Sequence, residues 1–496
     1  MKKTRVFSLF LALALCLTAA GCKGSSDPTY YSYWESDYEV VGGNTNSSGG
    51  SSSKKDTSSK KNNSSSGNAG TNSVDKNEAA QYVDKDNLAL RKEYEATHDV
   101  YNNPKLKGTT VEFATWIDHT TTEAKYAMET FEKTTGIKVK WIEVPQADYD
   151  KAILDRIAAG NAPDVWVTVG DGFPSDMYKG QPINKISTFD INDPIWNKDW
   201  LDTYKVGNNY YMVNTVNSIW CGGDLIYYNR TLFEDNGLLT PTDYEDNGEW
   251  SLEAMMEIMK AVNGLGDKYT GGFIDPKLMA ASLGAGIGYW KDGALHNGLN
   301  DDRTYQAWKY LYNAIDLGYY KKGVTMTDFA QGRVGLWMAD IYGMKKSGYF
   351  PSMSGESLGW IRLPSKINKN DKDSGCISAI PRGYGVCMGA KNPEGAVIFL
   401  RYFLDPLNYD WNSVFKNEEA KDYYLELIDV SKDQRIYDCV APVFISTYNT
   451  EGTLGYTLCN TTSGQLKATL DSVAPRVQKT IADHNAKLQE MINRDK

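Results

Sequence analysis

The spacing of hydrophobic and polar positions changes repeatedly along the chain after about residue 108. Residues 109–116 form a run rich in β-branched and aromatic side chains, and residues 137–144 alternate between apolar and polar positions, so both predict strands. Residues 122–134 carry apolar side chains at helical spacing and end at a glycine, which predicts a helix. A helix over 147–159 and a strand over 164–169 follow. This β-α-β-α-β order predicts a largely parallel, doubly wound sheet.

The same mixture of elements continues to the end of the chain. The pattern predicts helices over 251–263, 302–317, 393–404 and 465–489, and strands over 224–228, 334–338 and 383–389. A single hydrophobic core seldom serves a segment of about 390 residues, so we expect two lobes.

The N-terminus has the pattern of an export signal. A basic start precedes an almost unbroken apolar run over 6–20, which is short for a membrane-spanning helix. The small residues 19–21 then lead to Cys22, which resembles the lipobox of bacterial lipoproteins. In that family the cysteine is lipidated, so we expect 1–21 to be a lipoprotein signal peptide. An ordinary secretory signal remains an alternative, because Ala19 stands where the family prefers leucine.

The segment that follows Cys22 is dominated by a low-complexity tract of Ser, Asn, Gly and Lys over 44–73. Such a composition cannot bury a core and predicts disorder. We expect residues 22–80 to be a flexible tether that spans on the order of 40 Å as a coil. Signal, lipid and tether together predict a protein anchored at the outer face of the cell membrane.

The composition excludes several functions. The net charge of -10 and the pI of about 5.2 argue against binding of nucleic acid. The four histidines are scattered, and no cysteines have CxxC spacing, so we expect no metal site and no cofactor. Cys376 with Cys387, or Cys439 with Cys459, could be bridged outside the cell, but buried free thiols fit equally well.

Five motifs occur in order behind the signal: FEKTTGIKV at 131–139, AGNAPDV at 159–165, LIYYNRTLF at 225–233 before GL at 237–238, FAQGRVGLW at 329–337, and GYGV at 383–386 before NPE at 392–394. Each motif alone is weak. Together they resemble family 1 extracellular solute-binding proteins, the class that includes maltose-binding protein, over about 108–405.

The resemblance implies an α/β fold of the periplasmic-binding-protein type II: two doubly wound lobes joined by a hinge, with the ligand in the cleft between them. It places lobe 1 at 108–215, the first part of lobe 2 at 216–365, and a crossover back to lobe 1 at 366–405. The helical segment 406–496 would then belong mainly to lobe 2. It also implies a monomeric binding protein, not an enzyme, that passes a carbohydrate to the membrane permease of an ABC importer.

Candidate ligand contacts lie just beyond the predicted strands, because carboxylates bind sugar hydroxyls and aromatic rings stack on sugar rings. Asp118 and His119 follow the first strand, and Asp171 follows the third. The resemblance implies that Asp118 and Asp171 are ligand carboxylates. A helix cap at Asp118 and a plain turn at Asp171 are the alternatives.

Further candidates come from the second half of the chain, with core or interlobe packing as the alternative for the aromatic ones. They are Trp220, Asp275, Trp290, Tyr342 and Tyr384, with Asp340 as a weaker one. The resemblance implies that Tyr342 is an aromatic platform for the ligand.

Two other classes of protein remain open. A surface glycoside hydrolase needs only a pair of carboxylates, which the sequence does not exclude. A glycan-sensing or adhesive receptor could have kept the same fold without transport. No GxSxG elbow and no P-loop occurs in the sequence.

Overall fold

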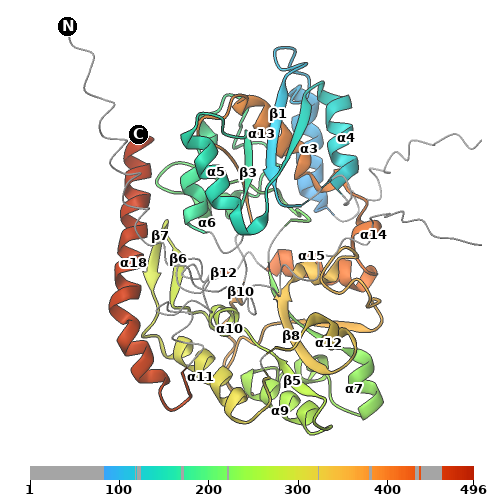
Figure 1. Cartoon of the computed structure of the whole chain (residues 1–496). Coiled ribbons are helices and arrows are strands. Elements are labelled where there is room, and N and C mark those ends of the chain that lie inside the picture. Colours follow the sequence, from blue (N-terminus) through green and yellow to red (C-terminus); the bar gives the residue numbers. More distant parts are fainter. Residues whose placement is uncertain are drawn as a thin grey trace, which may run out of the picture. The chain divides into compact units, whose positions relative to one another are not determined.

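The computed structural model describes residues 83–117, 119, 124–168, 173–220, 223–321, 323–378, 382–430, 435–436 and 461–496 (Figure 1). All of them belong to one unit, residues 48–496. The predicted signal peptide, Cys22 and the tether lie outside the described residues, as do Asp118 and Asp171.

The first sheet has the strand order β11-β3-β1-β2. β1 (Thr110–Thr115) runs parallel to both β2 (Lys138–Glu143) and β3 (Val165–Val167), which confirms the predicted parallel order. β11 (Tyr384–Val386) joins β3 in the antiparallel direction, although it lies far along the chain. The first sheet is therefore completed by a strand that returns from the second half of the molecule.

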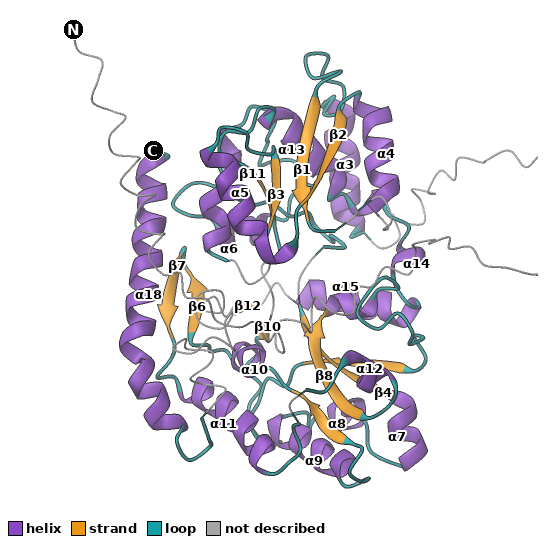
Figure 2. Cartoon of the chain, viewed as in Figure 1, coloured by secondary structure: helices purple, strands orange, loops and turns teal. Residues whose placement is uncertain are grey.

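Helices cover the first sheet (Figure 2). α4 (Ala124–Thr135) and α13 (Pro393–Phe403) pack together on the face that carries Phe113, whose ring lies 5.4 Å from that of Phe399. α5 (Tyr149–Ala158) is held to the sheet by the Tyr149 hydroxyl, which donates to the Ala114 carbonyl at 2.8 Å. These helices coincide with those predicted from the hydrophobic spacing.

The second sheet has the order β5-β8-β4-β9. β4 (Asp224–Asn229) and β8 (Val334–Asp340) were predicted from their apolar runs and are buried along their whole length. β4 runs antiparallel to β8 and to β9 (Leu358–Arg362), whereas β5 (Thr270–Phe273) runs parallel to β8. The second sheet is therefore mixed, unlike the parallel core of the first.

α9 (Leu252–Asn263) packs closely on the second sheet. Its apolar residues at helical spacing, from Leu252 to Val262, enter the core that the sheet shares with α10 (Pro276–Ser282) and α11 (Asp302–Asp316). At Gly271 of β5 a Cβ atom would lie 2.5 Å from the Cβ of Met259, so only glycine permits this approach.

The C-terminal helix α18 (Leu466–Arg494) contacts segments from both halves of the chain (Figure 1). Asn485 exchanges hydrogen bonds with the backbone of Leu295, in the hairpin of β6 (Gly288–Lys291) and β7 (Ala294–Asn297). Near its end, Arg494 donates to the Gly180 carbonyl at 3.3 Å.

The remaining described elements are short, except for two 13-residue helices. They are α3 (Lys85–Thr97), η1 (Gln146–Asp148), η2 (Ser175–Lys179), η3 (Ile183–Lys185), α6 (Lys198–Tyr204), α7 (Arg230–Asn236), α8 (Pro241–Asp246), α12 (Met326–Ala330), η4 (Ile341–Met344), β10 (Ile377–Ser378), η5 (Pro406–Asn408), α14 (Trp411–Val414), α15 (Glu418–Val430) and β12 (Arg435–Ile436).

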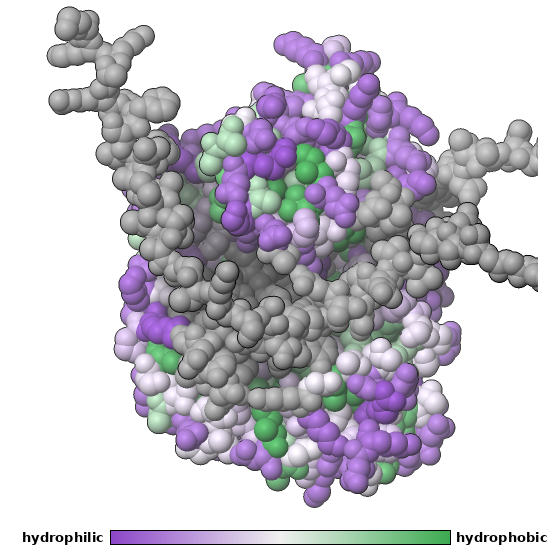
Figure 3. Space-filling view, viewed as in Figure 1, coloured by the Kyte–Doolittle hydropathy of each residue, from purple (hydrophilic) through white to green (hydrophobic). Residues whose placement is uncertain are grey.

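The surface is largely polar on the face shown in Figure 3. Among the described residues, the exposed large hydrophobic side chains are leucines, at positions 90, 154, 239 and 317. None of the helices that the structure describes is long and apolar enough to cross a membrane. Cys376 and Cys387 are buried thiols that no disulfide joins; Cys439 and Cys459 lie outside the described residues.

Candidate ligand-binding site

Three aspartates meet at one edge of the second sheet. Asp340 ends β8, and Asp275 follows the parallel strand β5 after one residue. Asp224 begins β4, which runs the other way, and it pairs in register with Asp340. Ligands of open α/β sheets bind beyond the carboxyl ends of the strands, so this edge is where a ligand is expected.

Asp340 organises this edge through both of its carboxylate oxygens. Oδ2 forms an ion pair with Arg382, and Oδ1 accepts the backbone N–H of Tyr342 at 2.9 Å. Arg382 lies on the segment that leads from β10 into β11 of the first sheet, so the ion pair links the second sheet to the chain's return path. The Arg382 side chain as a whole is 31% exposed.

Asp275 has a structural role as well as a suitable position. Its carboxylate caps α10 by accepting the N–H of Lys277 at 2.9 Å, and the Lys277 ammonium lies 3.5 Å from the other oxygen. The aspartate is therefore held in one orientation at the sheet edge.

Asp224 is the most deeply buried of the three, with 1% of its surface exposed. Its Oδ2 accepts the hydroxyl of Ser378 at 2.7 Å, whereas Oδ1 has no hydrogen-bond partner. Burial raises the pKa of the Asp224 carboxyl to about 7; the Ser378 hydrogen bond opposes this rise, and the nearby charges of Asp340 and Asp275 add to it.

An aromatic and cationic group continues the site beyond β8. Tyr342 lies on η4 with its ring partly exposed. The Lys345 ammonium lies 5.4 Å from the centre of that ring and 4.4 Å from the centre of the Trp220 ring. Lys345 thus stands between two of the predicted contacts. It was not predicted, because nothing in its sequence neighbourhood marks it as a site residue.

Three predicted contacts belong to one aromatic cluster around Phe403. Trp220 stacks on Phe403 with ring centres 5.7 Å apart, and the rings of His119 and Tyr384 lie 5.3 and 5.7 Å from it. Only 1% of His119 and 5% of Tyr384 is exposed. The structure therefore places both in the core beside the first sheet, which for Tyr384 is the packing alternative, and ligand contact by them stays a prediction.

Trp290 lies apart from these groups, on β6. Its ring centre is 4.9 Å from that of Phe173, and its indole N–H donates to the Thr203 carbonyl at 2.7 Å. The side chain is buried and joins the β6–β7 hairpin to the segment that follows β3. Contact between Trp290 and a ligand likewise stays a prediction.

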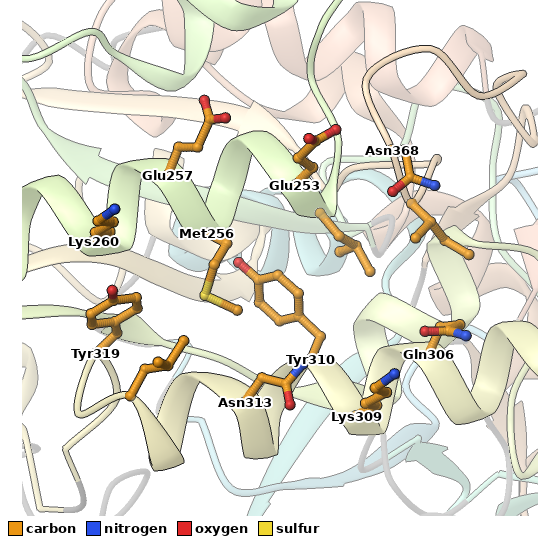
Figure 4. A pocket seen from close by; sticks show the side chains of 13 residues that line it. Glu253, Met256, Glu257, Lys260, Gln306, Lys309, Tyr310, Asn313, Tyr319 and Asn368 are labelled. Carbon is orange, nitrogen blue, oxygen red and sulfur yellow. The ribbon is translucent and has the colours of Figure 1, made fainter. Parts of the chain in front are cut away.

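Two grooves lie away from this sheet edge. One, of about 430 Å³, runs between α9 and α11, and Figure 4 shows Met256 and Tyr310 within it, with Glu253 and Lys309 at its sides. The other, of about 310 Å³, is lined by residues such as Tyr94, Asp190 and Arg401. Neither contains a predicted contact. Within the described part of the chain, no three or more His, Cys, Asp or Glu side chains are grouped so as to hold a metal ion.

Comparison with known proteins gives matches at the level of family and fold. A sequence model described as "Bacterial extracellular solute-binding protein" matches residues 114–408. No curated protein matches the sequence.

Three solved structures illustrate the similarity in fold. An ABC substrate-binding protein from Listeria monocytogenes in complex with cycloalternan has a TM-score of 0.52 and 17% identity, over 75% of this chain and 98% of the other. The GacH receptor of Streptomyces glaucescens has a TM-score of 0.55 and 15% identity, over 75% and 98%. A solute-binding protein from Staphylococcus aureus in complex with maltose has a TM-score of 0.51 and 16% identity, over 76% and 98%.

At these identities the structural similarity concerns the fold alone. It agrees with the two four-stranded sheets seen here, the first of which is completed by β11 from the second half of the chain. The sequence match extends over more than half of the chain. The protein therefore belongs to the family of bacterial extracellular solute-binding proteins.

Proposed function

We propose that this protein is the receptor subunit of an ABC importer, and that it captures a carbohydrate, first of all an oligosaccharide, and delivers it to a membrane permease. The observation that carries the proposal is the convergence of Asp275, Asp340 and Tyr342 at one edge of the second sheet. Cycloalternan and maltose occupy two of the similar structures, and both offer hydroxyl groups and ring faces to a binding site.

The chemistry of this edge suits such a ligand. Asp340 and Arg382 form a polar pair that can accept and donate hydrogen bonds to neighbouring hydroxyls. Tyr342, whose ring is partly exposed, offers aromatic surface for the C–H face of a sugar ring. We propose Trp220, buried between Phe403 and Lys345, as a contact that closure of the site would have to uncover. We propose Asp118 and Asp171 as the matching carboxylates from lobe 1, with His119, Trp290 and Tyr384 as further contacts. Closure of the lobes about their connecting strands would bring the two sets together.

A panel of oligosaccharides tests this function by thermal shift. A ligand that binds the folded protein raises its melting temperature, by an amount that grows with ligand concentration. We expect stabilisation by at least one of maltose, maltotriose, mannotriose and xylotriose, without cleavage of the sugar on analysis of the products. Absence of stabilisation by every glycan would contradict the carbohydrate assignment, and turnover would favour the glycoside hydrolase instead.

We propose further that the protein is a monomeric lipoprotein at the outer face of the cell membrane, anchored through Cys22 and a tether over 22–80. The support is the sequence alone: the apolar run, the small residues before the cysteine and the low-complexity tract. Replacing Cys22 with alanine should release the protein from the membrane fraction. Retention of the variant at the membrane would contradict lipid attachment at this residue.

A further inference from the structure

We propose that Asp224 is an additional acidic contact of the ligand site, and that it releases a proton to solvent when a carbohydrate hydroxyl binds to its free oxygen. This inference rests on the proposed function. If the inference holds, the affinity for the carbohydrate depends on pH through one residue, Asp224 at the start of β4.

The first support is the incomplete hydrogen bonding of a buried group. Asp224 Oδ2 accepts from Ser378, but Oδ1 is buried without a hydrogen-bond partner. Buried polar atoms are nearly always partnered, because an orphan acceptor destabilises a fold by about 1–3 kcal/mol. An oxygen of this kind at the edge where ligands bind is a place for a donor that the folded chain does not provide.

The second support is the distribution of charge around it. Asp340 has Arg382 as its ion-pair partner, and Asp275 has Lys277. Among the described residues, no basic side chain lies within ion-pair distance of Asp224. The titratable and charged groups that act on it are Asp340 from β8, Asp275 before α10, Arg382 before β11 and Tyr227 on its own strand.

The location allows access when the lobes move. Asp224 begins the strand by which the chain enters the second sheet, and Ser378 lies on the path by which it returns to the first. A hinge movement is absorbed at such connections, so it can uncover Oδ1 without breaking either sheet.

The direction of the proton transfer follows from the chemistry of the carboxyl group. With a pKa of about 7, the group carries its proton in about half of the molecules at pH 7. A ligand hydroxyl that donates to Oδ1 stabilises the ionised form. Binding therefore breaks the carboxyl O–H bond and passes the proton to water or buffer, while the ligand hydroxyl keeps its own hydrogen.

Titration calorimetry of the full chain tests the proposal, with maltose, maltotriose and mannotriose as probes. Affinity should be about tenfold weaker at pH 6 than at pH 8, because only the ionised form binds well. At pH 7 the heat should vary with the ionisation enthalpy of the buffer, in proportion to about half a proton released per ligand. Asp224→Asn should lose both effects, and the control Asp483→Asn, whose side chain is 64% exposed on α18, should retain them.

Three results would decide against the proposal. Wild-type affinity that is independent of pH, with heats independent of buffer, overturns the proton release and leaves the proposed function intact; this measurement needs no variant to fold. Retention of both effects in Asp224→Asn assigns the proton to another group. Failure of the folded protein to bind any probe contradicts the carbohydrate function itself, and the inference falls with it.

Discussion

Asp193, beside the first sheet, and Asp224, in the second, are both buried aspartates with very different surroundings. Arg401 approaches Asp193 with Nε 2.5 Å from Oδ2 and Nη2 3.2 Å from Oδ1, and the Ile195 N–H donates to Oδ1 at 3.1 Å. Asp224 receives a single hydrogen bond, from Ser378. Both oxygens of the Asp193 carboxylate therefore have hydrogen-bond donors from the protein, whereas one oxygen of Asp224 has none.

The difference distinguishes the ion-paired Asp193, which is structural, from Asp224, the proposed ligand contact. Arg401 also contacts Glu95 at 3.1 Å and the Tyr101 hydroxyl, so its network ties α3 to α13. Asp176 shows that an open oxygen alone is not enough. One of its oxygens has no partner, yet the other lies 2.6 Å from the Lys179 ammonium, which compensates the charge within the fold. Asp224 combines an open oxygen, a missing counterion and a position at a sheet edge.

The largest effect should come from breaking the closed network. Arg401→Ala leaves the Asp193 carboxylate buried without its cation, which is expected to lower the free energy of unfolding by about 3–5 kcal/mol. Urea denaturation followed by tryptophan fluorescence measures this loss. The folded fraction should bind its carbohydrate with unchanged affinity, because the network lies away from the proposed site.

Two controls sharpen this result. Lys479→Ala removes an ion pair with Asp483 whose side chains are 75% and 64% exposed, and it should leave stability unchanged within error. The double variant Arg401→Met with Asp193→Asn removes both charges and should recover part of the loss. A single Arg401→Ala variant as stable as wild type would show that the network is not structural.

The next effect concerns the incomplete carboxylate. The folded pKa of Asp224, about 7, lies above the ordinary value of 3.8, so the protonated form favours folding. This contribution is present at pH 4 and is lost as the pH rises through 7, by up to about 4 kcal/mol. The difference in unfolding free energy between wild type and Asp224→Asn should therefore fall across that range. Asp483→Asn, at an exposed position on α18, should leave the wild-type slope in place. A flat difference curve for Asp224→Asn would contradict the raised pKa.

A third effect should appear in ligand affinity alone. Tyr342→Ala, and separately Asp118→Ala, should weaken carbohydrate binding by about 10–100-fold, or about 1.4–2.7 kcal/mol. The Tyr342 ring is partly exposed, so the melting temperature of that ligand-free variant should change little. Tyr319→Ala, in the groove between α9 and α11, is a matched control that should bind normally. If Tyr342→Ala and Asp118→Ala both bind as wild type does, the site lies elsewhere.

Local patterns were sufficient to predict most of the longer helices and the strands β1 to β4, β8 and β11. β2 has partly covered residues between exposed ones, and α9 has one apolar face, so their spacing reveals them. β5 was missed because its two central glycines have no strand preference. The segment forms a strand by pairing with β8, and α9 and β8 leave no room for larger side chains at the two glycines. The antiparallel direction of β11 depends on pairing with β3, more than 200 residues earlier, which no local pattern contains.

The site was predictable only in part, for the same reason. Tyr342 follows β8, which was predicted, and Asp275 follows β5, which lies beside β8. Ligands bind beyond the carboxyl ends of such strands, so both residues are expected near the ligand. Asp224 lies at the amino end of β4, which runs antiparallel to β8, so this rule does not select it. Only the pairing of Asp224 with Asp340 shows that it lies at the same edge. His119 also follows a strand, yet its ring turns into the aromatic cluster, and the sequence does not indicate that choice.

The smallest effect should come from removing the one hydrogen bond that Asp224 has. Ser378→Ala deletes the hydroxyl that favours the ionised carboxyl, so the pKa of Asp224 should rise further. At pH 8 the variant should lose about 1 kcal/mol of unfolding free energy, and at pH 5, where the carboxyl is neutral, clearly less. Ser282→Ala is a matched control: this buried hydroxyl donates to the carbonyls of Met279 and Pro364, so its loss should be equal at both pH values. An equal loss for Ser378→Ala at pH 5 and pH 8 would mean that Ser378 does not sense the charge of Asp224, and the contrast with Asp193 would then rest on the open oxygen alone.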